Sequence, residues 1–247
     1  MRSLSTRRSS GALPRAALIR NLAALGAVVV LAVPSIAAAV PTVKPVPPVG
    51  KIYNRLAVDW WQYATSLPAA TNPLLDGTDC GAGQSGPVFF LVGLSGSGAV
   101  ERDCTVRAGK LLFFPLINAV DVHVPGDRLD TEDLVYKDFL SFGFRADTLF
   151  ASVDGAPVGN LNPATTPFRA CAAPVRGCGP SSFSLTFPDP PNLFGVAAGT
   201  YAPAVQDGYY LLLFPLRPGR HTIKFGGTGN FGGPVIQDIT YNLLVTR

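Results

Sequence analysis

The chain has 247 residues, 47% of them hydrophobic and only 15% charged, which allows a sizeable buried core and excludes wholesale disorder. Its 26 glycines and 23 prolines favour short elements joined by tight turns. The first 39 residues hold five of the 20 basic residues and no acidic one. The rest of the chain holds 15 basic and 16 acidic residues, a formal charge of −1 that excludes nucleic-acid binding through a basic surface.

Residues 1–39 are predicted to be a signal peptide. An arginine-rich segment precedes the apolar stretch Leu22–Ala39, which Pro34 interrupts, and the small residues Ala37–Ala39 suit a cleavage site after Ala39. A pair of arginines leaves both the general secretory route and the twin-arginine route open. We expect a secreted or periplasmic protein that meets a membrane only through its signal peptide during export. A transmembrane anchor, which needs about 20 apolar residues, is the alternative.

Residues 40–50 are rich in proline and are predicted to form an extended linker, followed by a single β-rich domain over residues 51–247. Apolar residues three and four apart predict a helix from Lys51 to about Ser66, which Pro68 ends. A second helix is predicted to begin with Asp130 as its N-cap, because acidic residues fill the turn that follows.

Two short apolar runs, Val88–Val92 and Lys110–Ile117, have the length and composition of buried strands. Further strands are predicted at Thr148–Val153, Ser182–Phe187, Tyr209–Leu216, His221–Phe225 and Ile236–Val245. Asp154-Gly155 and Pro218-Gly219 are typical turns between such strands. About eight strands and two short helices predict a mainly β fold, a jelly-roll-like β-sandwich, with an eight-stranded β-barrel as the alternative.

Four cysteines follow the predicted signal peptide, an even number that predicts disulfides in an exported protein. Three pairings are possible, and we favour Cys80–Cys104 with Cys171–Cys178, because each pair is local and closes a loop rich in glycine or proline. The spacing of the four does not match a zinc site. No metal and no cofactor are predicted.

Several segments together resemble a family of bacterial secreted proteins for which no activity is established. They are Asp59–Tyr63, Gly83–Leu91, Cys104–Lys110, Phe113–Asn118, Asp207–Tyr210 and Pro218–Gly227. The resemblance covers most of residues 51–247. It implies export and a common fold, and it brings no catalytic residues with it.

The two histidines are the weak candidates for catalysis. Asp121 and His123 would lie on the same face of a strand end and could act as an acid–base pair or as metal ligands. His221 follows the Pro-Gly turn and could join them from an adjacent strand. The simpler interpretation is that His123 lies in a loop exposed to water and that His221 only bonds locally at a strand start.

Aromatic residues are the weak candidates for ligand binding. Trp61, Tyr209 and Tyr210 could form a platform that stacks against a sugar, with one of the two tyrosines facing outward. Core packing is the competing interpretation, and it is favoured for Trp60 and Tyr63, which lie on the apolar stripe of the first helix.

No convincing catalytic set emerges from the sequence. We therefore expect an exported, non-catalytic binding, adhesion or envelope module, with a glycan or a surface protein as its partner. The alternative is a secreted hydrolase or metal-dependent enzyme that uses Asp121, His123 and His221.

Overall fold

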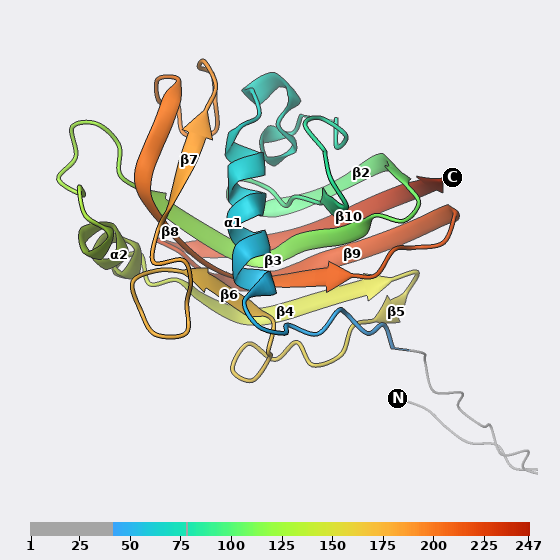
Figure 1. Cartoon of the computed structure of the whole chain (residues 1–247). Coiled ribbons are helices and arrows are strands. Elements are labelled where there is room, and N and C mark those ends of the chain that lie inside the picture. The colour runs from blue at the N-terminus through green and yellow to red at the C-terminus, as the bar shows by residue number, and fades with distance from the viewer. Residues whose placement is uncertain (1–41, 78) are drawn as a thin grey trace, which may run out of the picture. The chain divides into compact units, whose positions relative to one another are not determined.

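The computed structural model describes residues 42–77 and 79–247 (Figure 1); the predicted signal peptide and its cleavage site lie outside them. The helices are α1 (Ile52–Thr65) and α2 (Glu132–Ser141), with two 3-10 turns, η1 (Ala69–Thr71) and η2 (Pro73–Leu75). The strands are β1 (Val88–Phe90), β2 (Gly98–Arg107), β3 (Leu111–Val122), β4 (Arg145–Val153), β5 (Ala156–Pro157), β6 (Arg169–Ala172), β7 (Phe183–Phe187), β8 (Gly199–Leu213), β9 (Gly219–Asn230) and β10 (Pro234–Thr246).

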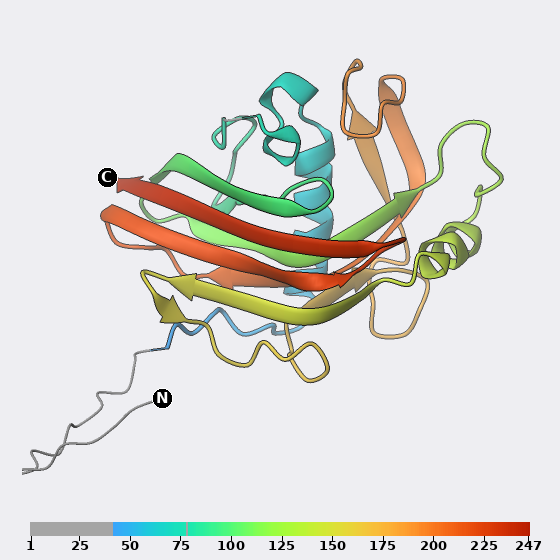
Figure 2. The same cartoon turned by 180° about the vertical axis from the view of Figure 1, so that it is seen from behind.

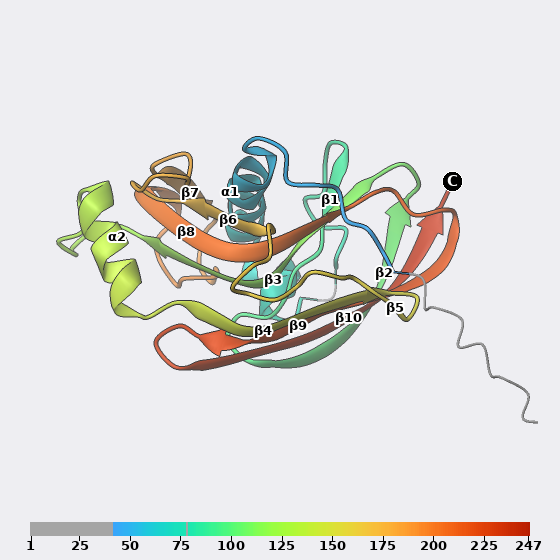
Figure 3. The same cartoon turned by 90° about the horizontal axis from the view of Figure 1, so that it is seen from below.

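The strands form two five-stranded sheets that lie face to face (Figure 3). In the first, the order is β1-β3-β8-β6, and β7 also pairs with β8; in the second, it is β2-β10-β9-β4-β5. Helix α1 covers the outer face of the first sheet, and α2 lies at one end (Figures 1 and 3). The predicted β-sandwich is confirmed. The barrel alternative is wrong, because both sheets keep open edges within the described residues.

Each sheet mixes parallel and antiparallel neighbours. β1 runs parallel to β3, and β2 runs parallel to β10 along its whole length, from Gly98 opposite Gln237 to Arg107 opposite Thr246. The other pairs are antiparallel. The view from behind shows β2 and β10 side by side at the edge of the second sheet (Figure 2).

Aromatic side chains fill both layers of the core. Between the sheets, the rings of Phe114 and Phe225 are 4.5 Å apart. On the other face of the first sheet, Phe113 stacks on Tyr210 and meets the edge of Tyr53 from α1. Leu56 and Trp60 of α1 are buried at the spacing that the sequence predicts, whereas Ile52, at the start of the same stripe, is exposed.

Some local predictions are confirmed and others are corrected. The turn at Asp154-Gly155 joins β4 to β5, with both residues at positive φ, as a two-residue hairpin requires. The N-cap of α2 is Thr131 rather than Asp130, since the Thr131 hydroxyl accepts from the Leu134 N–H. Pro218-Gly219 does not join a hairpin, because β8 and β9 lie in different sheets.

Residues 42–50 are extended as predicted, but they lie along the domain rather than hanging free. The N–H of Val43 donates to the Pro157 C=O, and that of Val46 to the Leu212 C=O. The Tyr53 hydroxyl in turn donates to the Val46 C=O at 2.7 Å. This segment therefore belongs to the folded unit.

Both favoured disulfides are present, Cys80–Cys104 and Cys171–Cys178. Such bonds persist in oxidising compartments, which supports a location outside the cytoplasm. None of the helices in the described residues is long and apolar enough to cross a membrane.

Candidate ligand cavity between the sheets

The candidate site lies where one edge of β3 loses its strand partner. β1 pairs only with Leu111–Phe113, and the chain then leaves the first sheet toward β2 in the second. Beyond Phe113, no strand among the described residues pairs with this edge, while β8 continues along the opposite edge to Val122. The gap beside the edge becomes a cavity between the sheets and the end of α1.

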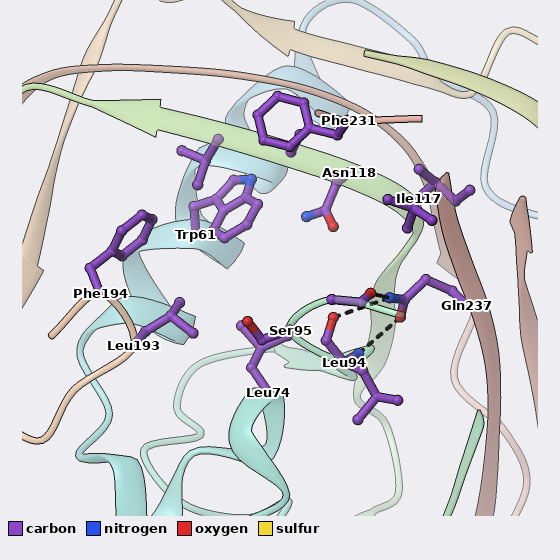
Figure 4. Close-up of a pocket in the computed structure, with 14 residues that line it drawn as sticks. Trp61, Leu74, Leu94, Ser95, Ile117, Asn118, Leu193, Phe194, Phe231 and Gln237 are labelled. Carbon is purple, nitrogen blue, oxygen red and sulfur yellow. Dashed lines mark hydrogen bonds between the residues drawn. The ribbon is translucent and has the colours of Figure 1, made fainter. Parts of the chain in front are cut away.

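The cavity has a volume of about 290 Å³, near the lower end of the range for small-molecule sites (Figure 4). Its apolar walls come from five parts of the chain: Trp61 of α1, Leu74 of η2, Ile117 of β3, Leu193 and Phe194 between β7 and β8, and Phe231 at the turn between β9 and β10. Ser95 and Phe194 are exposed and mark its mouth. None of the 14 lining residues carries a charge.

One wall is a loop that a buried glutamine holds in place. The side chain of Gln237 on β10 accepts from the Leu94 N–H at 2.9 Å and donates to the C=O groups of Leu94 and Gly96 (Figure 4). Gly93 approaches this amide so closely that a Cβ there would lie 2.5 Å from its oxygen. The loop is therefore fixed, and Gln237 has little hydrogen-bonding capacity left for a ligand.

The opposite wall carries polar atoms that the fold leaves unpaired. Trp61 is only 7% exposed, and its Nε1–H lies near the Tyr210 hydroxyl and is closed off from the cavity. That hydroxyl accepts from Asn118 Nδ2 at 3.3 Å and donates to Gln206 at 2.7 Å. Trp61 and Asn118 lie on the same side of the cavity (Figure 4).

Burial keeps Tyr210 neutral. It raises the pKa of the hydroxyl far above the usual range, although the nearby donors of Asn118 and Trp61 lower it in part. The hydroxyl is already used as both donor and acceptor, so it positions Asn118 rather than serving a ligand. The Asn118 Oδ1 has no hydrogen-bond partner among the described residues.

The backbone of β3 adds further open groups. The Tyr210 N–H donates to the C=O of Phe168, the residue before β6. The backbone N–H and C=O groups of Tyr209 and Asp207 therefore point toward β3. Alternation along the ladder then turns the N–H and C=O groups of Asn118 and Val120 away from β8, toward the open edge. The cavity thus combines apolar walls with a short row of donors and acceptors.

The structure does not bring the three catalytic candidates together. His123 follows β3 at the α2 end of the sandwich, and its Nδ1 bonds to Asp127. His221 is in β9, opposite Leu243, near the other end (Figure 1). Asp121 pairs with neither histidine; its Oδ1 accepts from the Val122 N–H, and its Oδ2 has no partner within the described residues.

His221 bonds locally, as the simpler interpretation predicts. Its Nδ1 lies 2.7 Å from Asp154 and its Nε2 lies 2.9 Å from the Arg217 C=O. Burial lowers its pKa, but the bonds to Asp154 and Arg217 outweigh that effect and raise it overall. The histidine ties the β4–β5 turn to the start of β9 and faces no cavity.

The predicted aromatic platform is wrong, because its three members do not share a face. Trp61 lines the cavity. Tyr210 is fully buried, and Tyr209 is 5% exposed beneath Arg169, with its hydroxyl bonded to the Pro163 C=O. The expectation that one tyrosine faces outward fails because the loop before β6 covers that side of β8.

No cluster of three potential metal ligands occurs within residues 42–77 and 79–247. Comparison of the chain with family models, with curated proteins and with solved structures gives no match. The function must therefore be argued from the cavity itself.

Sequence reasoning missed Asn118 and Gln237, the two amides that define the cavity. Asn118 ends an apolar run, which is a signal for a polar group placed beside a core. Gln237 lies on a strand whose other buried residues are apolar, which is a similar signal.

Proposed function

We propose that the mature domain is an exported, non-catalytic binding protein that holds a small, uncharged and largely apolar ligand in the cavity between its sheets. Export is supported by the leader pattern and by the two disulfides. The observation that carries the binding proposal is the row of unpaired polar groups in an otherwise apolar wall, namely Asn118 Oδ1 and the open backbone edge of β3. A polar group left without a partner in such a site costs about 1–3 kcal/mol, and a ligand that pairs with it would remove that penalty.

The absence of charged residues from the cavity lining determines which class of ligand it can hold. A carboxylate or ammonium group in a cavity with no charged residue would lose its hydration without gaining a partner. An uncharged molecule with one apolar ring or chain and a carbonyl oxygen fits the walls and the donor. The mainly apolar walls favour such a molecule over a glycan.

The indole protons allow a direct test, since the chain has only two tryptophans and both are buried. In a proton–nitrogen NMR spectrum of the oxidised mature domain, acetophenone should shift the Trp61 indole resonance, because the Trp61 ring lines the cavity. The Trp60 resonance should stay in place, because its proton is already bonded to the Leu91 C=O. Benzoate, of similar size but charged, should leave both unchanged.

A blocking variant provides the control. Ser95→Phe at the exposed mouth should abolish the shift without disturbing the core, whereas Ser181→Phe, at an exposed serine outside the lining, should preserve it. Failure of acetophenone to shift the Trp61 resonance in the unmodified domain would refute the proposal.

A further inference from the structure

The polar groups of the cavity wall define the ligand more closely than the apolar residues do. Asn118 donates through its Nδ2 to the Tyr210 hydroxyl, and its Oδ1 offers an acceptor to the cavity. The N–H of Val120, two residues further along the open edge of β3, offers a donor. A ligand with only a carbonyl group would satisfy the donor and leave the acceptor without a partner, and a ligand with only a hydroxyl donor would do the reverse.

The open edge of β3 repeats the same pattern. The backbone N–H and C=O of Val120 face the cavity beside those of Asn118, as the alternation along the ladder requires. A strand edge of this kind is matched by a group that carries one N–H and one C=O in a plane, which is the secondary amide. The side chains and the backbone of this wall therefore both match a secondary amide.

We propose, building on the proposed function, that the cavity selects uncharged N-acyl amides. The amide carbonyl accepts from the Val120 N–H of the open edge, the amide N–H donates to Asn118 Oδ1, and the acyl or aryl group fills the apolar space toward Leu74 and Phe194. Short peptides with blocked ends share this chemistry, but the cavity of about 290 Å³ admits only a small member of the class.

The test compares two probes of nearly the same shape, acetanilide and phenyl acetate. The ester oxygen of phenyl acetate replaces the N–H of acetanilide, so the ester leaves Asn118 Oδ1 unpaired. We expect acetanilide to bind about tenfold more tightly in NMR titrations, because an unpaired buried polar group is a strong basis for rejection. Binding of acetanilide should also shift the backbone amide of Val120.

Asn118→Ala removes the acceptor while keeping the Cβ. In this variant the preference for acetanilide should fall to about twofold or less, with ester binding nearly unchanged. Asn242→Ala, on β10 and outside the lining, should keep the tenfold preference. Thermal unfolding of both variants verifies that the domain remains folded.

The proposed function and the amide assignment can be refuted separately. Equal binding of amide and ester by the unmodified domain, or a tenfold preference retained in Asn118→Ala, overturns the amide assignment and leaves cavity binding intact. If neither probe shifts the Trp61 indole resonance, the proposed function fails, and the amide assignment fails with it. Because the Val120 shift is measured in the unmodified domain, the test does not depend on any variant folding.

Discussion

Two buried polar groups in this domain differ in how fully the fold satisfies them. The Arg102 side chain is 6% exposed and donates to the C=O groups of Pro73, Val92 and Gly93 and to the Tyr241 hydroxyl. Its guanidinium also lies over the Tyr241 ring. This cation joins η2, the chain segment after β1, and the second sheet, and its role is structural.

Trp61 shows the opposite case, and its neighbour makes the contrast sharp. Trp60 is fully buried and donates to the Leu91 C=O at 2.9 Å, whereas Trp61, one residue on, has no acceptor within the described residues. The two indoles meet edge to face at 4.9 Å. Trp60 is saturated and holds the fold, whereas Trp61 has only the nearby Tyr210 hydroxyl for its N–H and contributes its ring to the cavity wall.

The largest effect is expected where the saturated cation is removed. Arg102→Met should lower the free energy of unfolding by about 3–5 kcal/mol, because the Pro73 and Gly93 C=O groups lose their donor and the Val92 C=O keeps only the Tyr241 hydroxyl. Urea unfolding monitored by circular dichroism measures the change. Arg107→Met, at an exposed position of the same strand, should change it by less than about 0.5 kcal/mol. Comparable losses in the two variants would contradict a structural role specific to Arg102.

The paired tryptophans give the second prediction. Trp60→Phe should lower the free energy of unfolding by about 2–3 kcal/mol, since it creates a void and leaves the Leu91 C=O unpaired. Trp61→Phe removes no hydrogen bond and borders an existing cavity, so about 1 kcal/mol or less is expected. Chemical denaturation of both variants tests the order, and a larger loss at Trp61 would show that its N–H is bonded after all.

Asp121 gives the smallest effect and the one that depends on pH. Burial raises its pKa to about 6, and the carboxylates of Asp138 and Asp127 add to the rise. The folded state therefore binds the proton more tightly than the unfolded chain, so this stabilisation is complete below about pH 4 and is lost as the pH rises to about 6.

Asp121→Asn should remove that dependence. At pH 7 we expect a gain in the free energy of unfolding of about 1 kcal/mol, allowing for solvent around this half-buried group, and no gain at pH 4. Urea titrations at the two pH values measure the difference. The exposed Asp130→Asn serves as the control, and an Asp121→Asn gain that is the same at both pH values would refute the assignment.

Local patterns predict much of this fold because they depend on neighbouring residues alone. The period of α1, the Asp154-Gly155 turn and both local disulfides follow from short-range chemistry. β2 escapes prediction because Arg102 occupies a buried position of the strand and hides its apolar alternation. The turn at Pro218-Gly219 lies between two strands as predicted, but the assignment of these strands to different sheets depends on long-range packing.

The site is much less predictable than the fold. Trp61 is the one ligand candidate that lines the cavity, and its place there depends on contacts between distant segments, which no sequence pattern reveals. The open edge of β3 exists because β1 stops after three residues and the chain crosses to the other sheet. Such a gap is a property of the whole topology rather than of any segment.

The pairing of β2 with β10 has a consequence for folding order. Among the described residues, β10 is the only hydrogen-bonded neighbour of β2, yet about 130 residues separate the two strands along the chain. During synthesis, β2 has nothing to pair with until residues 234–246 emerge. Closing so long a loop is slow, so the nascent polypeptide remains open until its final strand arrives.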